Sequence, residues 1–149
     1  MNFPYIFTVE SFEKTFLSNN DAVEWLLQKS ILKYCGYCNK CERGMNLQTK
    51  ADKLDKKILR CTQCKAYSSV RSGTFLEKAK CSAKDFLRFV YFWACGCGIN
   101  QLHIFTGISE HTCIDYANFL REVASAKFEI EDRKLGGLGH VVQIDESLI

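Results

Sequence analysis

The sequence predicts an α+β protein in which a small β module is followed by a cluster of helices and by one further strand. Two CxxC pairs lie among short strand-like segments, which is typical of a small sheet organised around cysteines. Apolar residues then recur at helical spacing through residues 82–127. Last, the apolar run at residues 141–144 follows a glycine-rich joint and predicts a buried strand.

Composition excludes several classes of protein. The chain has 149 residues, of which 47% are hydrophobic and 25% charged, as is ordinary for a folded soluble protein. No apolar run approaches the ~20 residues that a membrane-spanning helix needs. The opening residues lack the basic and apolar regions of a secretory signal, so we expect the nine cysteines to be reduced thiols in a protein that is not secreted.

The net charge of +3 conceals an uneven distribution along the chain. Residues 33–88 contain fourteen basic and five acidic residues, a net charge of +9, whereas residues 1–32 carry −2 and residues 89–149 carry −4. A concentration of positive charge attracts a polyanion through counterion release. The alternative is a lysine-rich loop that is merely solvated.

The N-terminal segment, residues 1–34, is expected to be helical from residue 9 to residue 32. Asn20 is expected to cap a helix that starts at Asp21, because Asn is a preferred cap residue and an apolar face follows it. This segment is expected to pack against the β module and carries no residues that suggest chemistry.

Four cysteines are expected to hold a structural Zn²⁺. The pairs Cys38/Cys41 and Cys61/Cys64 are separated by a loop long enough to fold back, so that four thiolates meet in the arrangement of a zinc ribbon. The metal would supply folding free energy that so small a sheet cannot gain from burial. Cys35 leaves an alternative open, because Cys35 and Cys38 could form the first pair instead.

The zinc ribbon is assigned to residues 35–80. Its strands are expected at residues 44–48, 57–60 and 67–71, each next to one of the CxxC turns. Gly73 is expected to end the last strand with a turn.

Residues 81–128 are expected to form a domain like a helix-turn-helix. Ser82 can cap a first helix. A short helix at 100–105, a glycine turn at 106–109 and a longer helix at 110–127 follow it. In such an arrangement the second helix can enter the major groove of DNA.

The residues expected to contact DNA are basic groups of the β module and polar groups of the last helix. Asparagine can read adenine and arginine can read guanine, so these two residue types are the most informative on the helix. The candidates are Lys53, Lys56, Lys57, Arg60, Lys65, Arg71, His111, Thr112, Asn118 and Arg121.

Taken in the order in which they occur along the chain, these motifs resemble the N-terminal half of Merlin-type cut-and-paste DNA transposases and their bacterial insertion-sequence relatives. Besides the two CxxC pairs, the resemblance is carried by residues 69–75, the aromatic helix with Trp93, and residues 106–109, 119–122 and 136–147. It covers nearly the whole chain from Leu32. It implies that a zinc ribbon and a helix-turn-helix bind double-stranded DNA at the transposon's terminal repeats, with homo-oligomers as a further option.

The resemblance also places Asp145 on the family's first catalytic aspartate, at the end of the first strand of a ribonuclease-H-like nuclease domain. Residues 129–149 would then be the linker and the first strand of that domain. In the family a DDE triad holds two divalent metals, Mg²⁺ or Mn²⁺, but its other carboxylates would lie beyond Ile149. We therefore expect a truncated DNA-binding fragment whose catalytic domain is incomplete and which is inactive as an enzyme alone.

Two other functions are compatible with the same residues. One is a free-standing transcriptional regulator built from a zinc ribbon and a helix-turn-helix, and the other is a protein-interaction module. A DNA-binding protein of this kind is expected in the nucleus of a eukaryote, or otherwise with the nucleoid in the cytoplasm, and not at a membrane.

Overall fold

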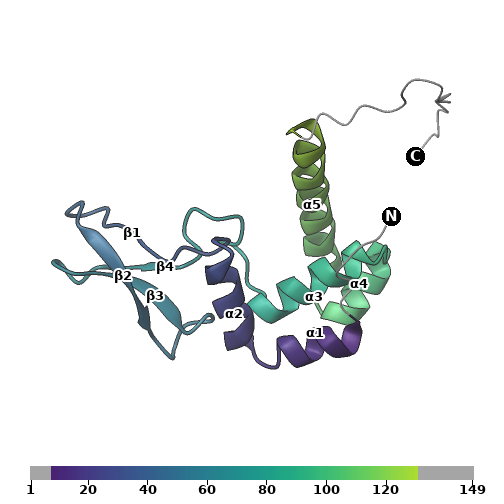
Figure 1. Ribbon diagram of the computed structural model, residues 1–149, viewed down its shortest axis with the longest axis horizontal. Coiled ribbons are helices and arrows are strands. Elements are labelled where there is room, and N and C mark those ends of the chain that lie inside the picture. Colours follow the sequence, from purple (N-terminus) through teal and green to yellow (C-terminus); the bar gives the residue numbers. More distant parts are fainter. Residues whose placement is uncertain (1–7, 131–149) are drawn as a thin grey trace, which may run out of the picture.

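The structure is a computed structural model, and it describes residues 8–130. Over these residues the fold is α+β, with five helices and one four-stranded antiparallel sheet, which confirms the predicted fold class. The sheet lies at one end of the molecule and most of the helices at the other, and the last helix projects from the helical part (Figure 1). None of the helices in the described part is long and apolar enough to cross a membrane.

The N-terminal segment forms two short helices, α1 (Val9–Thr15) and α2 (Asn19–Gln28), rather than one helical run. The residue that caps α2 is Ser18 and not Asn20, so that prediction was wrong. Ser18 and Asp21 form a capping box: the amide of Asp21 donates to the Ser18 hydroxyl at 3.3 Å, and the amide of Ser18 donates to the Asp21 carboxylate at 2.7 Å. This reciprocal pair satisfies two helix-terminal amides, which a cap at Asn20 would not do.

The strands of the sheet follow one another in the order of the sequence, each antiparallel to its neighbour. Two of them lie close to where they were predicted, and the first strand was not predicted because it is only two residues long. The last strand ends at Ser69, two residues earlier than expected, because Val70 and Arg71 turn into the protein interior. The strands are β1 (Gly36–Tyr37), β2 (Gly44–Thr49), β3 (Lys57–Cys61) and β4 (Tyr67–Ser69).

The sheet has an apolar inner face and a polar outer face. Met45, Leu59 and Cys61 are buried and belong to the hydrophobic core, which also contains residues of α2 and the buried Leu32. Cross-strand partners point to the same side of a sheet, and residues two apart along a strand share a side. The register therefore places another group of side chains on the opposite, outer face of the sheet. Ile58 is the only buried member of this group, which consists of Tyr37, Asn46, Gln48, Ile58, Arg60 and Tyr67.

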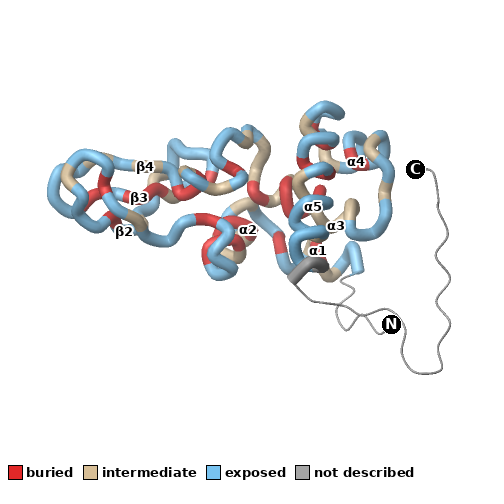
Figure 2. The backbone as a smooth tube through the Cα atoms, turned by 90° about the horizontal axis from the view of Figure 1, so that it is seen from above, coloured by how far each residue is buried: buried red, intermediate tan, exposed pale blue. Residues whose placement is uncertain are grey.

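The C-terminal part of the described chain consists of α3 (Ala83–Ala94), α4 (Ile99–Thr106) and α5 (Glu110–Ile130). Ser82 caps α3 as predicted, accepting a hydrogen bond from the amide of Asp85 at 3.0 Å. Figure 2 shows that the buried residues of these helices lie where they face one another. Fully buried side chains such as Phe89 of α3, Leu102 of α4 and Cys113 of α5 fill this part of the core.

Gly107 ends α4 in the left-handed conformation, with φ 69°, and its amide donates to the carbonyl of His103 at 2.9 Å. A Cβ at this position would meet no atom within 4 Å, so only the backbone conformation requires glycine. We expect Gly107→Ala to lower the free energy of unfolding by about 1 kcal/mol. Gly107→Asn should cost less, because asparagine tolerates this conformation better. Urea unfolding of the two variants tests the expectation, and equal losses would contradict it.

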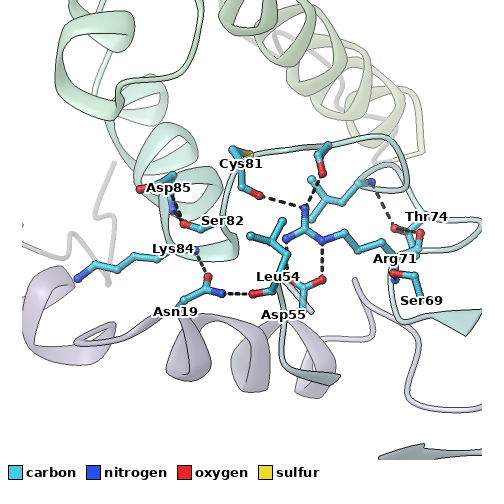
Figure 3. A network of polar contacts seen from close by, with 12 residues as sticks. Asn19, Leu54, Asp55, Ser69, Arg71, Thr74, Cys81, Ser82, Lys84 and Asp85 are labelled. Carbon is cyan, nitrogen blue, oxygen red and sulfur yellow. Dashed lines mark hydrogen bonds and ion pairs between the residues drawn. The ribbon is translucent and has the colours of Figure 1, made fainter. Parts of the chain in front are cut away.

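A buried ion pair connects the sheet to the helices (Figure 3). Arg71 and Asp55 are each about 4% exposed, and their side chains form two parallel hydrogen bonds of 2.6 and 2.5 Å. The same guanidinium donates to the carbonyls of Ala79 and Cys81, at 3.0 and 3.1 Å, just before α3 begins. Arg71 thus joins the β2–β3 loop, the end of β4 and the approach to α3.

A second polar link runs alongside the first. The side chain of Asn19, at the start of α2, donates to the carbonyl of Leu54 at 3.0 Å and accepts from the amide of Lys84 in α3 at 3.1 Å (Figure 3). A single cluster of buried residues extends from the helices to the sheet. The segments on either side of residues 34 and 80 therefore share one hydrophobic core, and the domain boundaries expected there stay predictions.

Candidate functional site

The four predicted cysteines form one cluster. The sulfur atoms of Cys38, Cys41, Cys61 and Cys64 all lie within 4.8 Å of one another. The Sγ–Sγ distance is 3.4 Å both between Cys38 and Cys64 and between Cys41 and Cys61. Four sulfurs around a tetrahedral zinc, with Zn–S bonds of about 2.3 Å, stand about 3.8 Å apart. The cluster therefore has the size and the donor set of a Cys₄ zinc site.

The structure also distinguishes between the two possible first pairs. Cys35 is exposed and lies outside the cluster, whereas Cys38 is buried and Cys41 half-buried within it. The first pair is therefore Cys38 and Cys41. Because all four positions of a tetrahedral site would be filled by protein thiolates, the chemistry of the cluster suits a structural metal rather than a catalytic one.

The two CxxC turns that present these sulfurs have the same backbone arrangement. In each, the amide of the first cysteine donates to the carbonyl five residues later, at 2.8 Å in both turns. The residue after the second cysteine is left-handed in each, with φ of 55° and 61°. With this shared geometry the two turns bring all four sulfur atoms close together. The residues concerned are Cys38, Glu42 and Arg43 in the first turn and Cys61, Lys65 and Ala66 in the second.

Backbone amides lower the pKa of two of the four thiols. The amide of Lys40 donates to Cys38 Sγ at 3.4 Å and lowers the pKa of that thiol. Desolvation opposes ionisation of Cys61, but backbone amides, that of Cys64 first, lower its pKa to about 6. The amide of Ala66 favours the thiolate of Cys64, but the hydrogen bonds that the Cys64 thiol donates to neighbouring sulfurs, that to Cys38 first, outweigh it together with desolvation and raise the pKa of Cys64 to about 11. A bound Zn²⁺ would compensate the negative charge that such a cluster collects.

The basic residues expected to contact DNA divide into an exposed and an engaged group. Lys53, Lys56, Arg60 and Lys65 are exposed around the sheet and its loops. Arg60 lies on the outer face, opposite Tyr67 of the neighbouring strand. All four side chains face solvent, although Lys65 Nζ donates to the carbonyl of Thr62 at 2.8 Å and Lys53 Nζ lies 3.9 Å from the carboxylate of Asp52.

Two of the expected contacts are engaged within the protein. The prediction for Arg71 was wrong: the side chain is only 5% exposed and its donors are taken by Asp55 and backbone carbonyls. Lys57 lies on the inner side of β3, where its ammonium is 2.8 Å from the carboxylate of Glu24 in α2 and its side chain is 18% exposed. Both positions stabilise the packing of the sheet on the rest of the chain.

The expected contacts on α5 also differ in availability. His111 is exposed but its ring Nδ1 lies 3.2 Å from the carboxylate of Asp115. Thr112 is half-buried, and its hydroxyl takes part in the cap at the start of the helix. Asn118 and Arg121 are exposed one turn apart, with a hydrogen bond of 2.8 Å from the guanidinium to the amide oxygen. This pair is the best placed of the four to reach a ligand.

Asp145 and the predicted strand at 141–144 lie outside the described residues. Of the linker expected from residue 129, the first two residues belong to α5 and the rest also lies outside the described part. Sequence reasoning missed two residues of the outer face, Tyr37 and Tyr67, which are 81% and 59% exposed. Successive residues of a strand point to opposite faces, so the sequence does indicate which residues of one strand share a face. Only the register between strands, however, shows that both tyrosines share a face with Arg60.

The site thus combines a closed four-cysteine cluster with a cationic surface on the same sheet. A closed set of four thiolates suits a structural metal. No family model, curated protein or solved structure matches this chain.

Proposed function

We propose that this chain is the DNA-binding part of a cut-and-paste DNA transposase and that its partner is duplex DNA at the transposon's terminal repeats. In this proposal the sheet is a zinc ribbon and α4 and α5 are a helix-turn-helix. The observation that carries the proposal is the four-cysteine cluster, which lies within the segment 33–88 that holds a net charge of +9. The ordered motifs that resemble the transposase family support the more specific assignment.

The exposed cations of the sheet would supply most of the affinity. Each lysine or arginine that neutralises a phosphate releases a condensed counterion, and this release dominates non-specific binding to DNA. Arg60 and Lys65 are exposed on or beside the outer face, and Lys53 and Lys56 extend the charge along the β2–β3 loop. A positive surface of this kind also steers the approach of duplex DNA.

The helices would supply the base contacts. The turn between α4 and α5 has a left-handed Gly107 and a buried Ile108, so it holds the two helices at a fixed angle. The first part of α5 packs in the core, and its C-terminal part projects away from it (Figure 1). Glu110 and Asp115 near the start of α5 would repel phosphates. We therefore place the contact at Asn118 and Arg121, whose side chains can read adenine and guanine.

Binding to a 30-base-pair duplex is expected to weaken steeply as salt rises. In Arg60→Gln/Lys65→Gln the slope of log K against log salt should fall by about 0.9 for each phosphate that the variant no longer neutralises. Fluorescence anisotropy at several salt concentrations measures this slope. Lys14→Gln is the matched control, because Lys14 is 73% exposed on α1, away from the sheet. An unchanged slope in the double variant, or affinity that does not depend on salt, would favour a protein-interaction module instead.

A transposase and a free-standing regulator would pass this first test equally. Selection of bound duplexes from a random pool separates the two. Under the transposase proposal the selected sequences match the terminal repeats of a mobile element in the source genome. Matches at isolated promoters alone would reject the transposase assignment and favour the regulator.

A further inference from the structure

Two exposed tyrosines lie on the outer face of the sheet, one on each edge strand. Tyr37 of β1 is opposite Gly44 of β2, and Tyr67 of β4 is opposite Arg60 of β3, which in turn pairs with Asn46. A Cβ at Gly44 would meet no atom of residues 8–130 within 4 Å, so the described part of the chain leaves the space directly over Gly44 open. Large aromatic side chains left this exposed on a sheet are available to stack on a flat partner.

A polar hollow lies on the sheet near these tyrosines. Its volume is about 320 Å³, at the small end of the range for ligand sites, and is large enough for a nucleobase. The side chains around it supply amide donors and acceptors together with two positive charges, as base edges require. The hollow is lined by Asn46, Gln48, Arg60, Cys61, Thr62 and Lys65.

The β2–β3 loop adds positive charge next to Tyr67. The ammonium groups of Lys50 and Lys53 lie 4.7 and 5.6 Å from the centroid of its ring. Asp52 offsets part of this charge, with its carboxylate 4.0 and 3.9 Å from the same two ammonium groups. Arg60 is a third cation beside Tyr67, and a second carboxylate, that of the exposed Glu77, lines the same pocket as Tyr67 and Lys53. Because these ammonium groups lie over the ring, a base that stacks there would displace them toward its own phosphate.

We propose that the outer face of the sheet binds single-stranded DNA, with bases stacked on Tyr37 and Tyr67 and with an unpaired base edge in the hollow between them. The bases of an intact duplex are stacked on one another, so only unpaired nucleotides offer a free face to a tyrosine. The two edge strands are three interstrand spacings apart, about 14 Å, which leaves room for several nucleotides. The inference rests on the proposed function, which supplies DNA as the partner. It adds that the sheet binds unpaired nucleotides.

Fluorescence anisotropy with a labelled 12-nucleotide oligothymidine and with a 30-base-pair duplex tests the inference on the full chain. Tyr37→Leu and Tyr67→Leu should each weaken binding of the oligothymidine at least about fivefold. Tyr37→Phe and Tyr67→Phe should stay within about twofold of the original protein, because they keep the ring. Circular dichroism and zinc content establish that the variants are folded, as expected for such exposed positions.

The results separate this inference from the proposed function. Duplex binding without binding of oligothymidine overturns the inference and leaves the proposed function intact. Binding of oligothymidine that depends on both rings, without duplex binding, upholds the inference and overturns the proposed function. Equal losses in the Phe and Leu variants would show that the hydroxyls act, through phosphate contacts, and would overturn the stacking. Tighter binding of oligouridine than of oligothymidine would overturn DNA as the partner.

Discussion

Replacing Cys61 with serine is expected to remove zinc binding and to unfold the four-stranded sheet. Cys61 ends β3, is buried, and contributes both a sulfur to the cluster and a side chain to the core. Structural zinc sites contribute about 10–16 kcal/mol to folding in small domains. Since whole domains are stable by only about 5–15 kcal/mol, the sheet cannot absorb such a loss. Zinc measured by mass spectrometry should fall from one per chain to nearly none, and strand signals in circular dichroism should disappear.

Cys35 and Cys95 provide the matched controls for this prediction. Both thiols are exposed and lie outside the four-cysteine cluster, so Cys35→Ser and Cys95→Ser should keep one zinc and the original stability. Two results would contradict the account: a Cys61→Ser protein with unchanged zinc content, or original protein that stays folded after a strong chelator has removed its metal. Unchanged zinc content would show that the metal binds elsewhere in the protein. A folded protein without metal would show that burial of apolar side chains alone keeps the sheet folded.

Local features of the sequence predicted most of the elements. The CxxC spacing predicted the cysteine cluster, because four thiols close together require two short turns and a returning loop. Ser82 with Asp85, and Gly107 at the end of α4, signalled helix boundaries through interactions within a few residues. Each of these signals involves residues that are near one another in the chain. Such signals do not require knowledge of the tertiary structure.

The misses that bear on the candidate site depend on residues far apart in the chain, unlike the misplaced cap of α2, which Ser18 forms with Asp21. Arg71 in a basic segment looks like any other DNA contact, and only the position of Asp55, 16 residues earlier, shows that it is buried and paired. The same holds for Tyr37 and Tyr67, which share a face only once the register of four strands is known. Charge counted along the sequence therefore overestimates the surface available to a polyanion.

Removing Asp55 is expected to be the most destabilising single change outside the cysteine cluster. Asp55→Ala would leave the guanidinium of Arg71 buried without its counter-ion, and the loss of one partner of such a pair costs about 3–5 kcal/mol. The loss should appear in urea unfolding of zinc-saturated protein. It should also loosen the attachment of the sheet to the helices, because Arg71 holds the carbonyls of Ala79 and Cys81 as well (Figure 3).

A double-mutant comparison separates the cost of an unpaired charge from the value of the pair itself. Asp55→Leu/Arg71→Met removes both charges, so it should recover much of the stability that Asp55→Ala loses, since apolar residues often replace a buried ion pair at little cost. The exposed pair of Lys14 and Glu10 is the control, and Glu10→Gln should cost about 0.5 kcal/mol or less. If Asp55→Ala cost no more than Glu10→Gln, the buried pair would not be what fastens the sheet to the helices. In that case the shared hydrophobic core alone would hold the two parts together.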